Sequence, residues 1–289
     1  MHAGGHAPQP GLVRALPLRR PQAGPDGPAG AREKIADRPL SRPHLSIVVP
    51  AFDEEDRIGR TVGHLVDDLR SRPWPAEILV VDDGSTDRTR ARAEEALRGF
   101  PDGRVLGEAE NRGKGYAVRQ GVLAARGAFI LFTDADLSTP VEELEKFWPV
   151  LGAGADIVIG SRALAGSDIQ VGQARVRQGM GKLFNLWVRI FLLKGIPDTQ
   201  CGFKLFRREA ARAVFEPLET RGFAFDVEVL LRARRLGFRV GQVPVVWRNS
   251  SPSKVRLVRS SVQMLAELRR LRRRFRKTQR RTSRANGTT

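Results

Sequence analysis

The stretch "FILFTDADLSTP", residues 129–140, decides the fold prediction. Its first residues are almost all apolar, and they lead directly into two aspartates one residue apart, Asp134 and Asp136. A short apolar run of this kind is typical of a strand that is buried on both faces. The pattern therefore predicts a central strand whose carboxyl end carries two carboxylates.

Short apolar runs alternate with helix-like segments on both sides of this stretch. Strands are predicted within residues 45–50, 77–85, 104–109, 128–136, 156–162, 197–215 and 239–247. Helices are predicted within residues 57–70, 85–100, 114–127, 174–195, 197–215 and 223–237. Alternation at this spacing indicates an α/β fold, with a mostly parallel sheet and helices on both of its faces.

Three of the predicted strands are followed by acidic loops, "FDEED", "DDGSTD" and "DAD". Ligands of such sheets bind beyond the carboxyl ends of the strands, where these loops would meet. So many carboxylates repel one another unless a cation or donor groups share the site. A lone D-x-D is more often a solvated loop, but this setting favours a site for Mg²⁺ or Mn²⁺ at Asp134 and Asp136. Asp82 is then a candidate to accept hydrogen bonds from a nucleobase or ribose.

Composition divides the 289-residue chain into three parts. Residues 1–43 are rich in Pro, Gly, Ala and Arg, which predicts disorder. A single domain is expected over 44–254, and a basic amphipathic helix with a disordered Arg-rich tail over 255–289. The net charge of +18 is concentrated in that tail, which is either a solvated end or an anchor on an anionic surface.

The sequence also excludes some classes of protein. One cysteine, Cys201, permits no internal disulfide and favours a reducing compartment; it is expected to be a small buried apolar residue. No apolar run reaches the roughly 18 residues of a membrane span. Two segments could still lie at a membrane surface. Residues 180–195 are apolar with interspersed bases and are otherwise a core helix, and residues 255–277 have an apolar stripe on a basic helix.

The motifs together carry a resemblance to a known family. "IVVPAFDEE", "ILVVDDGSTDRT", "NRGKGYAVRQG", "TDADLSTP", "GSR" and "DTQCGFKLF" resemble the family 2 glycosyltransferases over roughly residues 44–255. Within that family they are most similar to the dolichyl-phosphate β-glucosyltransferase and polyprenyl-phosphate mannosyltransferase branch. The resemblance implies a Rossmann-like GT-A fold, a nucleotide-sugar donor (UDP-glucose or GDP-mannose), a divalent metal (Mg²⁺ or Mn²⁺) and inversion at the sugar carbon.

The resemblance also implies roles for single residues. It implies that Asp134 and Asp136 bind the metal. It implies that the donor is bound by Pro50, Phe52, Glu54, Asp82, Lys114 and Asp134. Acceptor and phosphate binding falls to Arg162, Lys204, Arg248 and Lys254, and the catalytic set is Asp198, Arg162 and Lys204. Asp198 would orient the acceptor or act as a base. Asp226 and Glu228 are weaker candidates, which either share in catalysis or pair with nearby arginines.

The leading hypothesis is transfer of a hexose, with glucose favoured, to a polyprenyl or dolichyl phosphate. This enzyme would be cytoplasmic and attached peripherally to the inner face of a membrane through its basic C-terminal helix. Transfer to a soluble or glycan acceptor is the close alternative. A basic nucleic-acid-binding protein is a separate alternative, but no nucleic-acid partner is expected because the base excess lies outside the predicted fold.

Overall fold

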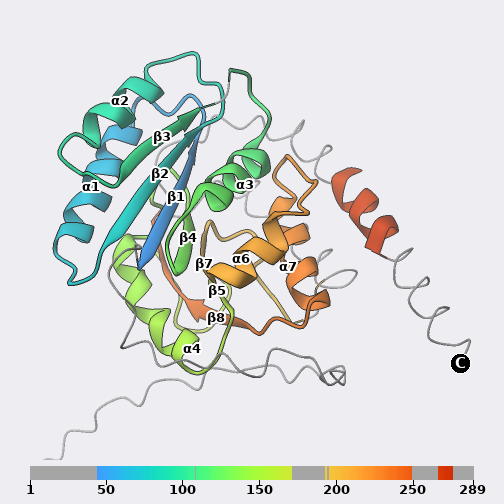
Figure 1. The fold of residues 1–289 in the computed structure, drawn as a ribbon. Helices are drawn as coiled ribbons and strands as arrows, with labels where there is room; N and C mark the ends of the chain where they lie inside the picture. The colour runs from blue at the N-terminus through green and yellow to red at the C-terminus, as the bar shows by residue number, and fades with distance from the viewer. Residues whose placement is uncertain (1–43, 108, 171–192, 194, 249–265, 276–289) are drawn as a thin grey trace, which may run out of the picture.

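The computed structural model describes residues 44–107, 109–170, 193, 195–248 and 266–275. The predictions for the N-terminal tail, for the apolar segment 180–195 apart from residues 193 and 195, and for Lys254 therefore lie outside the described residues. Within the described part, one seven-stranded sheet forms the centre of the molecule, with helices on either side (Figure 1).

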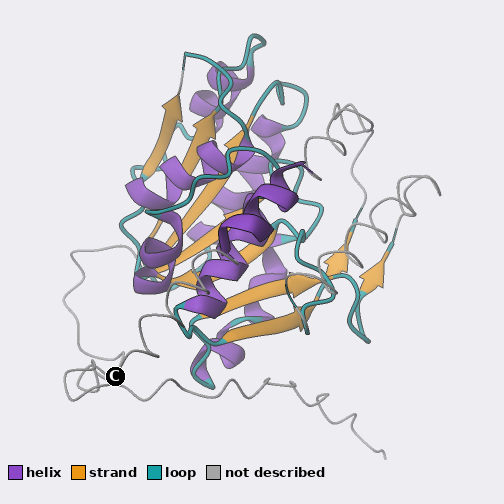
Figure 2. Cartoon of the chain, turned by 90° about the vertical axis from the view of Figure 1, so that its right-hand side faces the viewer, coloured by secondary structure: helices purple, strands orange, loops and turns teal. Residues whose placement is uncertain are grey.

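The sheet has the strand order β3-β2-β1-β4-β7-β5-β8. Its strands are β1 (Leu45–Ala51), β2 (Ala76–Asp82), β3 (Gly103–Gly107), β4 (Phe129–Thr133), β5 (Ile157–Ser161), β7 (Phe203–Arg207) and β8 (Val240–Pro244). A separate two-stranded pair, β6 (Asp168–Ile169) and β9 (Val246–Trp247), lies apart from it (Figure 2). Strands β1, β2, β4 and β5 are buried along their whole length, as their apolar sequences predict.

One strand of the main sheet runs against the others. β7 pairs antiparallel with both β4 and β5, whereas β1 is parallel to β2 and β4, and β5 is parallel to β8. Phe203, the first residue of β7, therefore lies opposite Thr133, the last residue of β4. The loop that enters β7 is thus brought to the same edge as the turn that leaves β4.

Two helical layers cover the sheet and divide the core into two clusters. One layer consists of α1 (Ile58–Arg70), α2 (Thr89–Ala96), the 3-10 helix η1 (Val141–Lys146) and α4 (Trp148–Gly152). The other consists of α3 (Lys114–Ala124), α6 (Arg208–Phe215) and α7 (Phe225–Arg235). In α1 the buried residues recur at helical spacing, so one stripe of the helix faces the sheet. The predicted mostly parallel sheet with helices on both faces is confirmed.

A further helix over residues 266–275 packs beside α7 (Figure 1). Leu268 and Leu271 are buried in the same cluster as α7, and Phe275 packs against it. This apolar stripe was predicted to lie at a lipid surface; within the described residues, Leu268 and Leu271 pack against the protein instead, and a membrane contact of the helix remains a prediction. Within the part of the chain that the structure describes, no helix has both the length and the apolar character needed to cross a membrane.

Candidate functional site

The candidate site lies at the carboxyl edge of the sheet, around the turn after β4. The backbone N–H of Asp134 donates to the carbonyl of Gly202 (3.2 Å), which ties this turn to the loop before β7. Leu137 in the turn has a positive φ of 44°, a conformation that costs energy for a non-glycine residue and is often found at functional sites. The backbone N–H of Ser138 donates to Asp136 Oδ1 (2.9 Å), which fixes the second carboxylate.

Lys114 reaches this turn from the first position of α3. Its Nζ lies 2.7 Å from Asp134 Oδ1, and both side chains are about one-quarter to one-third exposed (26% and 31%). Burial would lower the pKa of Lys114, but the charges of Asp134 and Asp226 outweigh it and raise the pKa. Lys114 therefore stays a cation beside the two carboxylates, and the predicted neighbourhood of Lys114, Asp134 and Asp136 is present.

A second ion pair, Lys204 with Asp226, lies beneath this turn. Lys204 Nζ contacts Asp226 Oδ1 and the carbonyl of Cys201, each at 2.6 Å, and the Lys204 side chain is only 1% exposed. Burial raises the pKa of Asp226, and the charges of Lys204 and Lys114 oppose that shift without cancelling it. Lys204 was predicted to bind a phosphate, but its ammonium group is enclosed and already has partners. Direct contact of Lys204 with a phosphate remains a prediction that needs this pair to open.

Arg162 and Asp198 form a two-pronged pair beside the same edge. Arg162 Nε donates to Asp198 Oδ2 (2.7 Å) and Nη2 donates to Oδ1 (2.9 Å), while the Arg162 backbone N–H also donates to Oδ2 (3.0 Å). Burial would raise the pKa of Asp198, but the bonds and charge of Arg162 hold it below its ordinary value. Asp198 is 1% exposed, whereas the Arg162 side chain is 27% exposed. The Arg162 side chain is therefore the more exposed member of the pair.

The loop after β2 supplies two adjacent aspartates with different contacts. Asp82 Oδ1 accepts from the backbone N–H of Ser85 (3.1 Å). Asp83, which sequence reasoning did not single out, accepts from the backbone N–H groups of Arg112 (2.9 Å) and Gly113 (2.8 Å). Asp83 thus fixes the loop that leads directly into Lys114. The only sequence signal for it was its place as the second acid of "VVDDGSTD".

The remaining predicted donor residues follow β1. Pro50 is buried within the strand, and Phe52 is one of the exposed large apolar residues, at 42%. The backbone N–H of Glu54 donates to Thr89 Oγ1 (2.7 Å), and its carboxylate pairs with Arg57 (2.6 Å). The loop after β1 is therefore held to the N-terminus of α2, next to Asp82. Binding of a nucleobase by these residues remains a prediction.

The other candidates lie at or beyond the rim. The backbone N–H of Arg248 donates to the carbonyl of Ser138 (2.7 Å), so Arg248 is anchored at the Asp134–Asp136 turn. Its Nε donates to Gln170 Oε1 (3.1 Å). Glu228 pairs with Arg232 and Arg274. Of the two alternatives predicted for it, a share in catalysis or pairing with nearby arginines, the contacts match the second.

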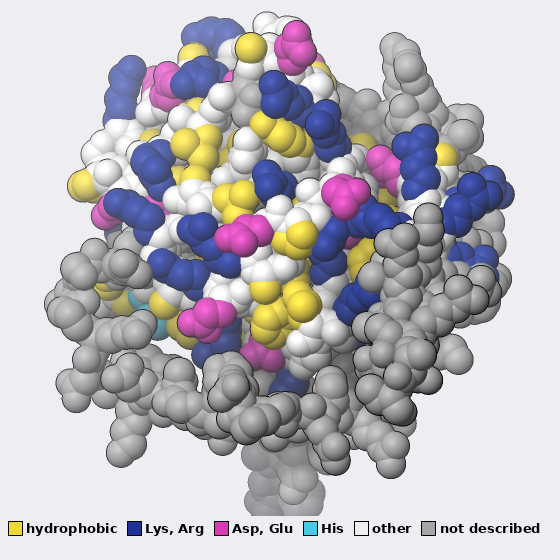
Figure 3. Space-filling model, turned by 45° about the vertical axis from the view of Figure 1, so that its right-hand side comes forward, with side chains coloured by type: hydrophobic (Ala, Val, Ile, Leu, Met, Phe, Trp, Pro, Cys, Tyr) yellow, Lys and Arg dark blue, Asp and Glu magenta, His cyan; other side chains and the backbone are white. Residues whose placement is uncertain are grey.

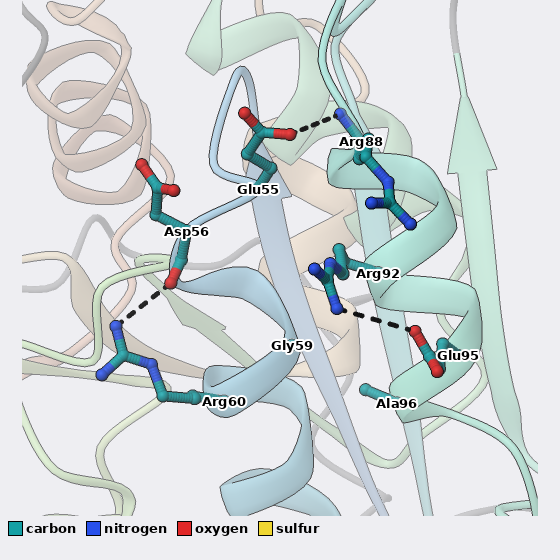
Figure 4. A pocket seen from close by; sticks show the side chains of 8 residues that line it. All are labelled: Glu55, Asp56, Gly59, Arg60, Arg88, Arg92, Glu95 and Ala96. Atoms are coloured by element: carbon teal, nitrogen blue, oxygen red, sulfur yellow. Dashed lines mark hydrogen bonds and ion pairs between the residues drawn. The ribbon is translucent and has the colours of Figure 1, made fainter.

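A hollow of about 570 Å³ lies elsewhere, between the N-terminal end of α1 and one side of α2 (Figure 4). Its walls carry arginines and acids that bond within the hollow: Arg60 to the carbonyl of Asp56, the backbone N–H of Arg88 to Glu55, and Arg92 to Glu95. None of the predicted site residues lines it. The chemistry of the acidic turn is therefore separate from this hollow.

The metal prediction can be tested against the side chains present. The described residues contain no group of three or more His, Cys, Asp or Glu side chains placed to hold a metal ion. Asp134 and Asp136 still offer carboxylate oxygens from one turn, the ligands that Mg²⁺ and Mn²⁺ prefer. A cation here would complete its coordination with water and ligand phosphate oxygens, which fits two protein ligands.

Comparison with known proteins identifies the family of the chain. Residues 46–215 match the family described as glycosyl transferase family 2. A dolichyl-phosphate β-glucosyltransferase of Dictyostelium discoideum is 34% identical over 82% of this chain and 76% of its own length. The mouse protein of the same name is 36% identical over 84% of this chain and 78% of its own length.

Solved structures share the fold. Glucosyl-3-phosphoglycerate synthase of Mycobacterium tuberculosis, solved with Mn²⁺, UDP-glucose and phosphoglyceric acid, superposes with a TM-score of 0.61. It is 22% identical, and the match covers 80% of each chain. The predicted GT-A fold is confirmed. The chain belongs to glycosyl transferase family 2 and is a glycosyltransferase, so the prediction of an enzyme is confirmed.

Proposed function

We propose that this family 2 glycosyltransferase moves glucose from a nucleotide diphosphate sugar, with UDP-glucose as the first candidate, to dolichyl or another polyprenyl phosphate. The observation that carries the proposal is the gathering of Asp134, Lys114 and Arg162 at one edge of the sheet, in a chain 34–37% identical to several dolichyl-phosphate β-glucosyltransferases. Carboxylates and cations together suit a donor with a diphosphate and an acceptor with a phosphate.

The donor half of the site is assigned to the loops after β1, β2 and β4. Asp82 and the loop containing Phe52 and Glu54 would hold the base and ribose. Lys114 would face the diphosphate. Asp134 and Asp136 would hold a divalent cation, which would neutralise charge on the diphosphate leaving group when bound. Because Lys114 already touches Asp134 Oδ1, it would share that carboxylate with the cation or turn towards the phosphates.

The acceptor half is assigned to Arg162 and Arg248; Lys254, which was also predicted to bind phosphate, lies outside the described residues. A phosphate oxygen of the acceptor would form a bond to the anomeric carbon as the bond from that carbon to the diphosphate breaks, which inverts the carbon. A phosphate monoester has a second pKa of about 6, so the nucleophile needs little help from a base. Asp198 is held ionised by Arg162, so its role is to fix the guanidinium. Lys204 would act through Asp226 as a buried balancing charge.

A membrane contact is proposed on the basic face rather than on the apolar stripe. Figure 3 shows Lys and Arg side chains spread over the side of the molecule that carries α3, α6 and α7. Exposed arginines include Arg234 and Arg235 at the end of α7, and Arg269 and Arg270 on the helix over residues 266–275. Such a face is attracted to anionic lipid. Peripheral attachment at the cytoplasmic face, where this surface could bring the site to a lipid acceptor, stays a proposal.

Calorimetric titration of the whole protein tests the donor half. UDP-glucose and GDP-mannose are each titrated with and without Mn²⁺, against wild type, Asp134→Asn and Asp136→Asn. Metal-dependent binding of UDP-glucose that both substitutions weaken is expected. Equal binding by both variants would remove the metal assignment, and preference for GDP-mannose would replace glucose as the sugar.

Transfer of labelled glucose tests the acceptor half. Dolichyl phosphate and water-soluble acceptors are offered in separate assays, and the product is extracted into organic solvent. Label that enters the organic phase only with dolichyl phosphate is expected, and Arg162→Met should abolish it while donor binding persists. Label that stays in water with a soluble acceptor would overturn the lipid assignment.

A further inference from the structure

The helix over residues 266–275 contacts the loop formed by residues 219–224, which precedes α7. Arg274 pairs with Glu228 and with Glu219 at one end of this loop. Glu228 is fully buried and accepts from the backbone N–H of Thr220 (2.9 Å). The C-terminal helix therefore holds the start of the 219–224 loop through two carboxylates.

The same helix holds the other end of the loop through Glu267. Glu267 Oε2 accepts from the backbone N–H of Ala224 (3.3 Å), and the carboxylate lies against Gly222, where an added Cβ would come within 2.5 Å of Oε1. Leu268 and Leu271, which lie between Glu267 and Arg274 in the sequence, are buried. Both ends of the loop are thus fastened to one helix.

The 219–224 loop in turn fixes the N-terminus of α3. The carbonyl of Arg221 accepts from the backbone N–H of Gly115 (2.7 Å) and of Tyr116 (3.3 Å). The first N–H groups of a helix have no partner inside the helix, so this carbonyl completes the start of α3. An added Cβ on Gly115 would lie 2.5 Å from the Thr220 carbonyl, so loop and helix touch with no room between them.

The start of α3 is where the donor site begins. Lys114 is the first residue of that helix, its Nζ lies 2.7 Å from Asp134 Oδ1, and Phe223 of the loop has its ring 5.9 Å from the same nitrogen. A continuous set of contacts therefore runs from Arg274 and Glu267, through the 219–224 loop, to the cation beside the acidic turn.

We propose that the helix over residues 266–275 is a positioning element of the donor site, with Arg274 and Glu267 as its positioning residues. Through their contacts with the 219–224 loop and Glu228, both residues act on the position of Lys114. This inference extends the proposed function, because it assigns the C-terminal helix to donor binding and not only to a membrane surface.

Two variants and one matched control test the inference. Arg274→Met and Glu267→Ala each remove one fastening, and Arg273→Met removes the same charge from an exposed neighbour on the same helix. In protein without ligand, deuterium exchange at the Gly115 and Tyr116 amides is expected to speed up about tenfold in both variants. These amides donate to the Arg221 carbonyl, and each variant removes a hydrogen bond to a charged group that holds the loop carrying this carbonyl. Arg273→Met should exchange as the wild type does, and Arg274→Lys should recover part of the protection.

Donor binding is measured on the same samples without lipid. Calorimetry with Mn²⁺ gives the Kd for UDP-glucose, which is expected to rise about fivefold or more in Arg274→Met and Glu267→Ala, the usual size of coupling between distant sites, and to stay unchanged in Arg273→Met. Unchanged amide exchange, or faster exchange with an unaltered Kd, would overturn the inference. If the wild type binds no nucleotide sugar, the proposed function fails, and the exchange experiment alone decides whether the helix fixes the start of α3.

Discussion

At the residue scale, Gly202 makes room for the carboxylate of Asp134. An added Cβ at this position would lie 2.0 Å from Asp134 Oδ2 and 2.3 Å from its carboxyl carbon. No heavy atoms approach so closely without bonding, so a larger residue must move either the carboxylate or the loop before β7. The glycine of "DTQCGFK" therefore contributes to the site by leaving the space that the Asp134 carboxylate occupies.

Gly202→Ala is expected to lower metal-dependent affinity for UDP-glucose about tenfold or more, because a displacement of about 1 Å at a site can cost far more than that in rate. Calorimetry measures the affinity, and thermal unfolding checks that the protein is folded. Gly63→Ala in α1 is the matched control, because no atom lies within 4 Å of its added Cβ. Retained metal-dependent affinity in Gly202→Ala would mean that Asp134 does not need its present position.

The pair of Lys204 and Asp226 allows a separate test at the same scale. Lys204→Met leaves a buried carboxylate without its partner, and such a change costs about 3–5 kcal/mol of unfolding free energy. The double variant Lys204→Met with Asp226→Asn should recover part of this loss, since no uncompensated charge then remains. Urea unfolding gives both values. Full stability of Lys204→Met would argue that Lys204 is held for a substrate and not for Asp226.

At the element scale, loops are held in place by carboxylates that accept hydrogen bonds from backbone N–H groups. Asp83, directly after β2, accepts hydrogen bonds from the backbone N–H groups of Arg112 and Gly113, which lead into α3. Asp53, in the loop after β1, receives the backbone N–H of Thr86 (2.9 Å) from the loop after β2. The carboxylates of this edge therefore divide into two groups: some are proposed to face the donor, and others hold the loops in place through hydrogen bonds.

Asp83→Asn tests this fastening role. The amide keeps the shape of the side chain but offers one acceptor where the carboxylate offers two, so one backbone N–H is left without a partner at a cost of about 1–3 kcal/mol. Unfolding free energy should fall by that amount, and UDP-glucose should bind several-fold more weakly. Asp67→Asn on exposed α1 surface is the control. An unchanged donor affinity together with a clear loss of stability would show that the loop held by Asp83 does not influence donor binding.

The order of strands and helices could be predicted because each is a local pattern. The direction of β7 could not, since antiparallel pairing with β4 and β5 depends on how the loop before it crosses the edge. The same limit applies to the site. Asp134, Asp136 and Lys114 follow from motifs, but the partnership of Lys204 with Asp226 joins a strand to a helix 22 residues away, which no spacing rule reveals.

At the scale of the whole molecule, a buried polar network lies at the edge of the sheet opposite the proposed site. The proposed site occupies the carboxyl edge, whereas the amino edge holds a buried network around Glu77 in β2. Glu77 Oε1 accepts from Ser46 Oγ (2.6 Å) and from the backbone N–H of Arg126, and Oε2 accepts from Arg126 Nε (2.9 Å) and Arg104 Nη2 (3.2 Å). This network joins β1, β2, β3 and the segment before β4, so it fixes the strands without touching the site.

Glu77→Gln should therefore change stability without changing donor affinity. At pH 7 the loss is expected to be about 1.5–3 kcal/mol, because hydrogen bonds to a charged group are replaced by weaker ones. Glu94→Gln, which removes an exposed carboxylate paired with Arg90, should cost about 0.5 kcal/mol or less. A weaker affinity of Glu77→Gln for UDP-glucose, with the fold intact, would show that the two edges are coupled after all.

The same variant gives a dependence on pH with a defined sign. Burial would raise the pKa of Glu77, but its bonds to Ser46 and Arg126 outweigh that effect and hold the pKa below its ordinary value of 4.5. A carboxyl with a lowered folded pKa stabilises the protein above its unfolded pKa, and that stabilisation is lost as the pH falls through the folded value. The stability advantage of wild type over Glu77→Gln should accordingly be full above pH 4.5 and shrink below it. Urea unfolding of both proteins at several pH values measures this difference, and an advantage that persists unchanged well into acid would assign the stabilisation to contacts that do not depend on the charge of Glu77.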